Sequence, residues 1–196
     1  MCVKRKILSI FGKMVYNVGM EKTVNKKEIF KGKVLHVFCD DALSENGTPC
    51  VREYLHHPGG VCVLAVNEQK VAFVRQYRYA LSKHLLELPA GKLEHGEDPY
   101  AAGCRELTEE TGFVAEKLIP MGTIIPTCGY SDEVIYLYLA SGLKKGTACP
   151  DADECLDLVF VDFDQAVSMA KSGEITDAKS VVLLLKADTY FKENKL

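Results

Sequence analysis

Three glutamates lie close together near the middle of the chain, at positions 106, 109 and 110. In an α-helix, residues at i, i+3 and i+4 share one face, so these carboxylates would crowd a single stripe and repel each other at neutral pH. Hard oxygen ligands at this spacing suit Mg²⁺ or Mn²⁺, which also takes oxygens from a substrate phosphate. The stripe therefore predicts a metal site. The alternative is a solvated acidic face with Arg105 paired to Glu109.

The helix that carries this stripe has recognisable end signals. Asp98 is a good N-cap, Pro99 suits the first helical position and Gly112 suits the C-terminal cap, which predicts a helix over about residues 99–111. The helical period places the small Ala102 and Gly103 on the acidic face, where we expect them to leave room for a phosphate. The opposite side is expected to face the core and carries Tyr100, Cys104, Leu107 and Thr111.

Two further features precede this helix. Arg75 and Arg78 are separated by only two residues, and guanidinium groups can fork onto phosphate oxygens. Pro89 and Gly91 suit a tight backbone bend that could aim a carbonyl group at the metal. The alternative for the arginines is that they are ordinary surface residues of a strand.

Composition limits the class of protein. The 196 residues are 47% hydrophobic and 26% charged, which is typical of a globular chain with one main core. The net charge is −3 without a basic block, which argues against a nucleic-acid surface. No stretch approaches the roughly eighteen apolar residues of a membrane span. The expected partner is a small molecule.

The cysteines indicate the compartment. All eight are scattered along the chain without a CxxC pair, which favours reduced, buried thiols over disulfides or zinc. Reduced thiols are typical of a cytoplasmic protein. The positions are Cys2, Cys39, Cys50, Cys62, Cys104, Cys128, Cys149 and Cys155.

The beginning of the chain divides into two parts. Residues 1–20 are expected to form an N-terminal extension without fixed structure, followed by a small antiparallel β region over residues 21–58. Asn46-Gly47 between alternating apolar runs is a strong hairpin signal within that region. His56 and His57 close it, and we expect a polar turn there, because no third metal ligand lies nearby in the sequence.

Residues 59–196 are predicted to form the main domain. The continuous apolar run 61–66 suits a central strand, and a second strand is expected over 71–76. Further strands are predicted at 118–126, 134–140 and 156–161, and helices at 164–172 and 176–191. This order predicts an α/β sandwich, in which a mixed sheet carries helices on its faces.

The stretch from residue 91 to 113, GKLEHGEDPYAAGCRELTEETGF, matches the Nudix box in all its fixed positions. By this resemblance the chain is identified as a member of the Nudix hydrolase superfamily. The segments RQYR, LLELPAGKLEHGE, GYSDE and GEITDAKSVVLLL are similar to the ADP-ribose pyrophosphatase branch, over residues 22–185. The resemblance implies hydrolysis of a nucleoside diphosphate sugar: ADP-ribose and water give AMP and ribose 5-phosphate.

The resemblance also implies the metal ligands. Glu106 and Glu110 would be the chief ligands of Mg²⁺, with Mn²⁺ as an alternative; Glu109 would contribute and the carbonyl of Ala90 would complete the protein shell. Gly91 and Gly112 would support the site. A homodimer is implied as well, because the N-terminal β region is similar to the dimerisation region of that branch.

Other roles follow from the same resemblance. Arg105, which the resemblance places with Glu109 among the catalytic groups, would pair with Glu97, and Glu97 would support the loop before the helix. Arg78 would contact the ribose and phosphate end of the substrate, with Arg75 as a second substrate residue. Glu87 lies where the branch keeps a carboxylate of the substrate site.

By the same resemblance, the general base is expected in the loop far beyond the box. Glu154 is the candidate, with Asp153 and Glu133 as rivals. One position departs from the branch, because Cys128 stands where a proline is usual, and this leaves the sugar and base of the substrate open. A GDP-mannose hydrolase and a catalytically silent, ligand-sensing Nudix module remain as alternatives.

Overall fold

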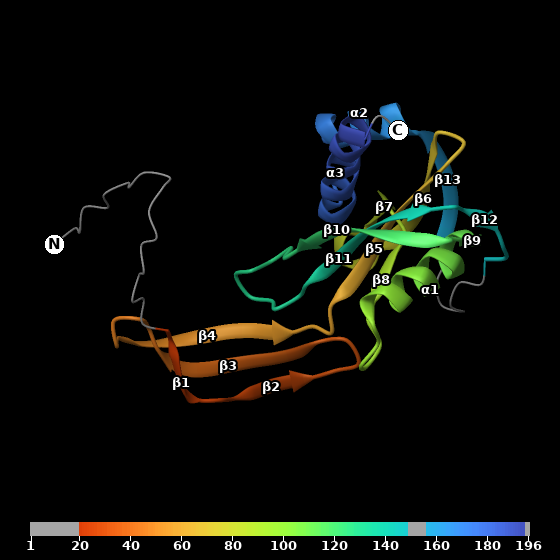
Figure 1. The fold of residues 1–196 in the computed structure, drawn as a ribbon. Coiled ribbons are helices and arrows are strands. Elements are labelled where there is room, and N and C mark those ends of the chain that lie inside the picture. The colour runs from red at the N-terminus through yellow and green to blue at the C-terminus, as the bar shows by residue number, and fades with distance from the viewer. Residues whose placement is uncertain (1–19, 149–155, 195–196) are drawn as a thin grey trace, which may run out of the picture.

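The computed structural model describes residues 20–148 and 156–194, and Figure 1 traces their path. The strands are β1 (Lys22–Asn25), β2 (Glu28–Lys31), β3 (His36–Leu43), β4 (Pro49–His56), β5 (Gly60–Asn67), β6 (Lys70–Arg78), β7 (Lys83–Glu87), β8 (Ala90–Lys92), β9 (Phe113–Val114), β10 (Lys117–Ile124), β11 (Ile135–Ser141), β12 (Lys144–Lys145) and β13 (Leu156–Asp162). The helices are η1 (Tyr79–Leu81), α1 (Pro99–Thr111), α2 (Phe163–Ser172) and α3 (Ala178–Asn194).

The first four strands form an antiparallel sheet that extends away from the rest of the molecule (Figure 1). β3 pairs with β4 along its whole length, and β1 and β2 pair with the other edge of β3. The hairpin predicted from Asn46-Gly47 is present, and Gly47 has a φ of 81°, a conformation that glycine adopts without steric cost. Much of this sheet is exposed, including Ile29 and Phe30.

A seven-stranded mixed sheet forms the body of the molecule. Its main order is β10-β11-β5-β6-β13, with β8 paired to β5 and β7 paired to β6. The β5–β11 pair is parallel and the other pairs are antiparallel. β5 lies in the middle and is buried over Gly60–Ala65, as its continuous apolar run predicts.

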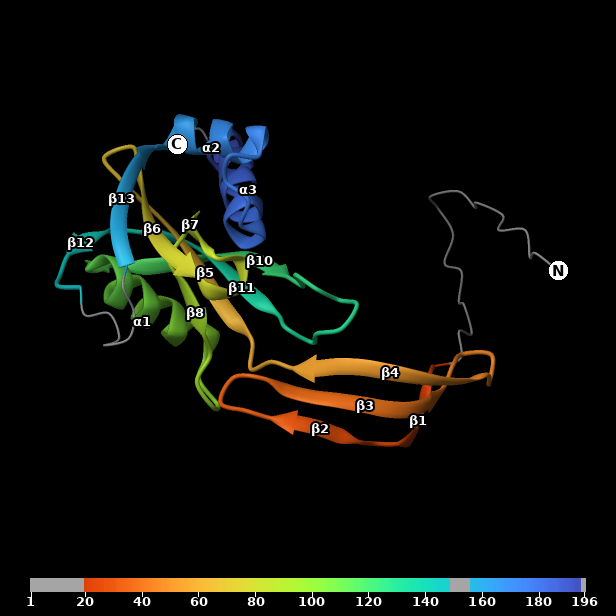
Figure 2. The same ribbon diagram turned by 180° about the vertical axis from the view of Figure 1, so that it is seen from behind.

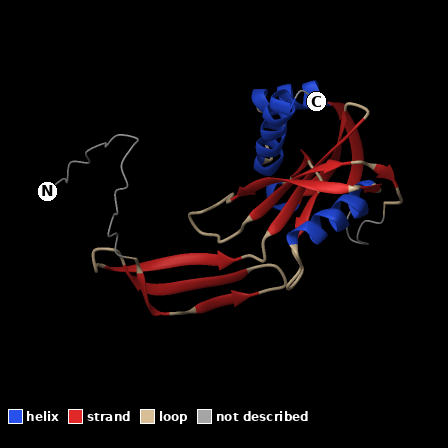
Figure 3. Cartoon of the chain, viewed as in Figure 1, coloured by secondary structure: helices blue, strands red, loops and turns tan. Residues whose placement is uncertain are grey.

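Two hydrophobic cores lie on the two faces of this sheet, because successive strand residues point to opposite sides. Cys62 and Leu64 of β5 pack in the core beneath α2 and α3. Val61 and Val63 pack in the core with Leu107 of α1. Figures 2 and 3 show α1 on one side of the sheet and the pair α2 and α3 on the other. The predicted α/β sandwich with a mixed sheet is confirmed.

The structure adds strands that the sequence reasoning did not anticipate. A tight bend was expected at Pro89 and Gly91. Pro89 lies between two short strands, β7 and β8, whereas Gly91 lies within β8. Both strands pair with neighbours inside the body sheet. The reason is tertiary, because the partners β5 and β6 supply hydrogen bonds to a segment too short to show a strand pattern by itself.

The N-terminal sheet is joined to the body through the loop before β11. The N–H of Leu55 donates to the carbonyl of Tyr130 at 2.8 Å. His56 contacts Asp132, with 2.5 Å between Nδ1 and Oδ2, and His57 lies 3.5 Å from Glu133. The joint is therefore polar, in agreement with the interpretation of the two histidines as a polar turn.

The prediction of reduced, buried cysteines agrees with the structure only in part. Cys39, Cys50, Cys62, Cys104 and Cys128 are free. Cys62 is fully buried, whereas Cys128 is exposed, so the expectation of buried thiols is wrong for Cys128. The remaining three cysteines lie outside the described residues.

None of the helices within residues 20–148 and 156–194 has both the length and the apolar character needed to span a membrane.

Candidate active site

Helix α1 begins and ends where its capping residues predict. The Asp98 carboxylate accepts hydrogen bonds from the N–H groups of Tyr100 and Ala101, at 3.0 and 3.1 Å. Gly112 has a φ of 72° and its N–H donates to the carbonyl of Thr108 at 2.8 Å. A Cβ at Gly112 would also lie 2.8 Å from the Ala148 nitrogen, so both conformation and space favour glycine here.

The expectation that Ala102 and Gly103 leave room for a phosphate is wrong. Both are buried, and a Cβ at Gly103 would lie 2.8 Å from Cδ1 of Leu118 on β10. These small residues let α1 approach the sheet closely. Glu110 is itself buried, so part of the acidic stripe lies within the packed face rather than opposite the core. Helical periodicity defines an angle around the axis but not which neighbours lie there.

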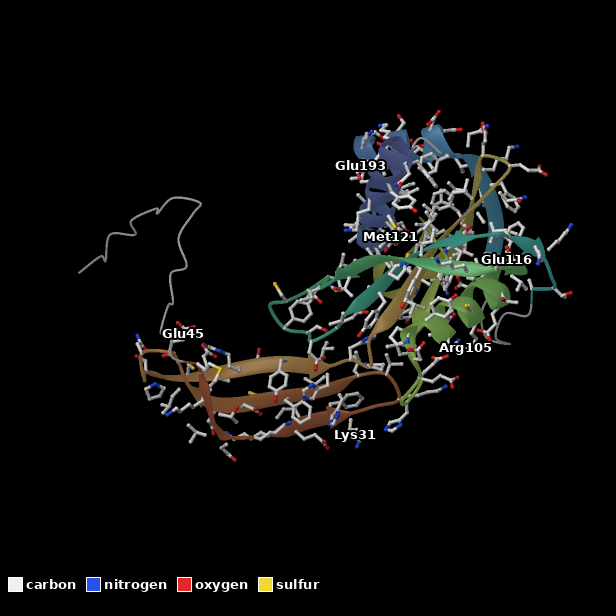
Figure 4. The ribbon with its side chains drawn as sticks, in the orientation of Figure 1. Lys31, Glu45, Arg105, Glu116, Met121 and Glu193 are labelled. Carbon is white, nitrogen blue, oxygen red and sulfur yellow. The ribbon has the colours of Figure 1, made fainter. Side chains whose placement is uncertain are left out.

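Glu97, Arg105, Glu106 and Glu109 form one connected group, here called the box cluster. Arg105 donates to both oxygens of Glu97, each at 2.9 Å, and through Nη1 to Glu106 at 2.8 Å and Glu109 at 3.0 Å. The Glu97 hydrogen bonds, foremost, raise the pKa of Arg105, and the guanidinium in turn holds the pKa of Glu97 below its ordinary value. Figure 4 marks Arg105 on α1, beside the segment that leads from β8 into the helix.

The segment Ala90–Gly91 lies directly against two carboxylates of α1. The N–H of Ala90 donates to Oε2 of Glu110 at 2.9 Å. A Cβ at Gly91 would lie 1.9 Å from Oε1 of Glu106, so only glycine admits this close approach without moving the carboxylate. The sequence-predicted ligands Ala90, Glu106 and Glu110 are therefore brought together by packing of α1 on β8.

The donor set can be tested for its fit to a divalent cation. Oxygens of Glu106 and Glu109 both lie within 3.0 Å of one nitrogen of Arg105, and Glu110 flanks the adjacent Ala90. These are hard oxygen donors, which suit Mg²⁺ or Mn²⁺. Within the described part of the chain, no group of three or more His, Cys, Asp or Glu side chains is arranged to hold a metal as it stands. The carboxylates instead face Arg105 and a backbone N–H group.

Arg78, Glu87, Asp177 and Lys179 form a second group, here called the Glu87 cluster. Arg78 donates to both oxygens of Glu87, each at 2.6 Å, and Lys179 contacts Glu87 and lies 3.0 Å from Asp177. Only 1% of Glu87 is exposed. Burial acts to raise the pKa of Glu87, but Arg78 and Lys179 outweigh it and hold that pKa below the ordinary value. Two buried or half-buried cations thus balance two carboxylates.

Arg78 also interacts with a carboxylate of α1. Its pKa is raised, first by the hydrogen bonds to Glu87 and further by the charges of Asp177 and Glu110. Arg78 and Glu110 are therefore close enough to interact electrostatically.

Arg75 does not lie with Arg78. Residues three positions apart on a strand point to opposite sides. Arg75 lines a separate hollow together with Lys83, Met169 and Glu174.

The candidates for the general base are only partly visible. Glu154 and its rival Asp153 lie outside the described residues. Glu133 is within them and lies 3.5 Å from the His57 ring, at the polar joint. Asp177 and Lys179 are functional-site candidates that were not expected from the sequence. The signal was present in the quoted segment GEITDAKSVVLLL, where two charged residues precede an apolar helical run.

Comparison with known proteins agrees with this geometry. The NUDIX domain family matches residues 56–184, which include the box cluster and the Glu87 cluster. The "Methanol dehydrogenase activator" of Bacillus methanolicus is 42% identical over 165 residues, covering 83% of this chain and 89% of the relative. The "ADP-ribose pyrophosphatase" of Bacillus subtilis is 39% identical over 163 residues, covering 82% and 88% respectively.

A solved structure, described as an ADP compounds hydrolase, superposes on this fold with a TM-score of 0.81 at 20% sequence identity. It covers 91% of this chain and 98% of the solved chain, which supports the fold assignment. With the box residues assembled as described and the family match spanning most of the body, the chain belongs to the Nudix hydrolase superfamily, in its ADP-ribose pyrophosphatase branch.

Proposed function

We propose that this enzyme hydrolyses ADP-ribose with water to AMP and ribose 5-phosphate, in a reaction that depends on Mg²⁺. The observation that carries the proposal is the convergence of two groups on the segment 87–91. Glu106 and Glu110 of α1 contact this segment at residues 90 and 91, and Arg78 donates hydrogen bonds to Glu87 at its first residue. The name of the Bacillus subtilis relative supports the choice of ADP-ribose.

The metal would be held by Glu106, Glu109 and Glu110 with the Ala90 carbonyl. When bound, it supplies charge neutralisation at the diphosphate and lowers the pKa of a coordinated water. Glu97 holds Arg105 in place through two hydrogen bonds, and Arg105 in turn orients Glu106 and Glu109. Gly91 admits the Glu106 carboxylate against the backbone, and Gly112 ends the helix that carries all three glutamates.

The substrate residues are proposed to act by charge and shape. The Arg78 guanidinium offers a planar, permanently charged donor to a diphosphate oxygen. Glu87 fixes that guanidinium through Nε and Nη2, which leaves Nη1 outside the pair. Arg75 has a lesser part, because it lines a different hollow.

Glu154 is proposed as the general base that takes a proton from the attacking water. Glu154→Gln should lower kcat by about 10²- to 10⁴-fold, the usual contribution of a general base, with little change in Mg²⁺ affinity. The comparison variants are Asp153→Asn and Glu133→Gln. If Glu154→Gln keeps its rate while one of these two variants loses its rate, the residue changed in that variant is the base.

Two properties of the whole protein complete the proposal. We infer a homodimer formed through the N-terminal sheet, whose exposed Ile29 and Phe30 would be covered by a second copy. A cytoplasmic location is supported by the free cysteines of the described residues. Sedimentation equilibrium of the wild type and of Ile29→Asp tests the first, since a monomeric wild type contradicts it.

A substrate panel tests the reaction. The purified protein is incubated with ADP-ribose, GDP-mannose and other nucleoside diphosphate sugars in Mg²⁺, in Mn²⁺ and in a chelator, and the products are separated by chromatography. We expect AMP and ribose 5-phosphate from ADP-ribose, and no product in the chelator. Faster turnover of GDP-mannose would reassign the substrate, and tight binding without any product would indicate a silent ligand-sensing module.

A further inference from the structure

The first turn of α3 holds the strand segment that carries Glu87. Ser180 Oγ accepts the N–H of Leu88 at 2.8 Å, while Lys179 contacts the Glu87 carboxylate. Asp177 braces both helix residues: its carboxylate lies 3.0 Å from Nζ of Lys179 and accepts the Ser180 N–H at 3.1 Å. Two consecutive residues of the helix are thus joined to two consecutive residues of the strand and the turn after it.

The charges in this contact are arranged unequally. The side chains of Glu87 and Lys179 are only 2% and 11% exposed, whereas that of Arg78 is 41% exposed. Glu87 therefore has one cation on the buried side and one on the solvent side. Only the solvent-side cation, Arg78, is positioned to reach a ligand.

If Glu87 had only one cationic partner, the loss of that partner to a substrate would leave a buried carboxylate unpaired, at a high cost in free energy. Removing one partner from a buried ion pair strongly destabilises the charge that is left. With Lys179 on its buried side, Glu87 keeps a counter-ion whatever contacts Arg78 makes. The Glu87 carboxylate also keeps its place, because Lys179 is itself tied to Asp177.

We propose that Lys179 is a positioning residue of the active site: it anchors the Glu87 carboxylate, and through it holds the Arg78 guanidinium in place for an oxygen of the substrate diphosphate. This inference rests on the proposed function, in which Arg78 contacts the diphosphate. Lys179 itself touches no substrate, and its effect passes through Glu87.

Isothermal titration calorimetry tests this role. It measures the affinity for ADP-ribose in the presence of a chelator, where no turnover is expected. Lys179→Met should raise Kd about tenfold, because only the orientation of a binding group is lost. In Mg²⁺ it should raise KM by a similar factor and leave kcat nearly unchanged. Lys179→Arg should restore most of the affinity by restoring the charge. Lys192→Met on the same helix is the matched control, since its ion pair with Asp188 is exposed, and it should leave Kd unchanged.

A second pair of variants decides whether Lys179 acts through Glu87. Glu87→Gln should raise Kd as Lys179→Met does. The double variant Glu87→Gln with Lys179→Met should have the same Kd as Glu87→Gln alone, because without the Glu87 carboxylate Lys179 no longer acts on Arg78. This comparison stands even if Lys179→Met alone does not fold. A Kd for Lys179→Met equal to that of the wild type, or a double variant weaker than Glu87→Gln, overturns the proposal.

Different results contradict the proposed function and the role of Lys179. A wild type that binds ADP-ribose without hydrolysing it contradicts the proposed function, while the Kd series still decides the role of Lys179. A wild type that hydrolyses ADP-ribose, with a Lys179→Met variant of unaltered Kd and KM, leaves the function standing and removes Lys179 from the site.

Discussion

The box cluster and the Glu87 cluster both join arginine to glutamate, but they differ in charge balance and burial. In the box cluster a single arginine faces three carboxylates, and the Glu109 side chain is 38% exposed. In the Glu87 cluster two cations face two carboxylates, and Glu87 is almost fully buried. The first group has an excess of negative charge beside solvent, and the second is neutral as a whole.

This difference assigns the two clusters different tasks. An excess of carboxylates near solvent attracts a further cation, which suits a metal site that is loaded from solution. A buried, balanced network has its groups satisfied and thereby holds them in one geometry. We therefore expect substitutions in the box cluster and its neighbour Glu110 to affect metal-dependent rate, and substitutions in the Glu87 cluster to affect stability and substrate affinity.

Among substitutions in these two clusters and their neighbours, Glu110→Gln should have the largest effect. The amide keeps an oxygen for the Ala90 N–H but removes the negative charge that a metal needs, so kcat/KM in Mg²⁺ should fall on the order of 10³-fold, equivalent to about 4 kcal/mol. Turnover is measured across a Mg²⁺ titration, and circular dichroism checks that the melting temperature is retained. Near-normal turnover at limiting Mg²⁺ would refute the assigned role.

Glu87→Gln should have its main effect on stability. It leaves Arg78 and Lys179 without their shared carboxylate, at an expected cost of about 3 kcal/mol in the free energy of unfolding. Urea denaturation measures this against Glu116→Gln, whose exposed pair with Lys144 should contribute less than about 1 kcal/mol. Equal losses for the two variants would break the distinction between buried and exposed pairs.

The same variant carries a pH signature. The pKa of Glu87 is lower in the folded state than its ordinary value, so the unfolded chain binds more protons in acid. The stabilisation is present above the ordinary pKa and is lost as the pH falls through the folded-state pKa. The wild type should therefore lose stability below about pH 4.5, and Glu87→Gln should flatten that slope. An unchanged slope would contradict the assignment.

Gly91→Ala tests the close approach of Glu106 to the backbone in the proposed metal site. A Cβ at this position would collide with the Glu106 carboxylate and displace it, while the strand β8 can keep its pairing with β5. We expect Mg²⁺ affinity to fall about 10- to 100-fold, measured by kinetics at varied Mg²⁺. Gly129→Ala serves as the control, because a Cβ there meets nothing within 4 Å. Equal behaviour of the two variants would sink the argument.

The smallest effect in the series is that of Arg78→Lys. One ammonium cannot replace the two parallel bonds to Glu87 or a planar contact to phosphate, so kcat/KM for ADP-ribose should fall about tenfold. Arg75→Lys should be milder, because Arg75 lies away from this pair. Steady-state kinetics of both variants provide the measurement, and unchanged values for both would remove the arginines from the substrate site.

Local signals account for the parts of the fold that were predicted well. Helix α1 has the bounds expected from Asp98, Pro99 and Gly112, because capping is decided within a few residues of each end. The hairpin at Asn46-Gly47 and the central strand β5 follow from equally local patterns. Prediction was weaker for β7 and β8, whose strand character depends on pairing with β5 and β6.

The candidate site divides along the same line. The box residues could be named from their spacing, because their spacing along one helix determines their relative directions. The Glu87 cluster could not be assembled in this way, because Lys179 lies 92 residues beyond Glu87 in the chain and meets it only after folding. The role expected for Ala102 and Gly103 was wrong for the same reason, since only the packed sheet shows what fills the space beside them.

The amino-acid sequence by itself determined the identity of the acidic helix, its ends, the central strand and the kind of cation that its carboxylates suit. These depend on neighbours within one or two turns, where backbone geometry is nearly invariant. Tertiary structure alone decided that Ala90 meets Glu110, that Arg78 and Lys179 share Glu87, and that Arg75 faces elsewhere. Those contacts arise from the docking of α1 and α3 on the sheet, and burial then makes each charge require its partner.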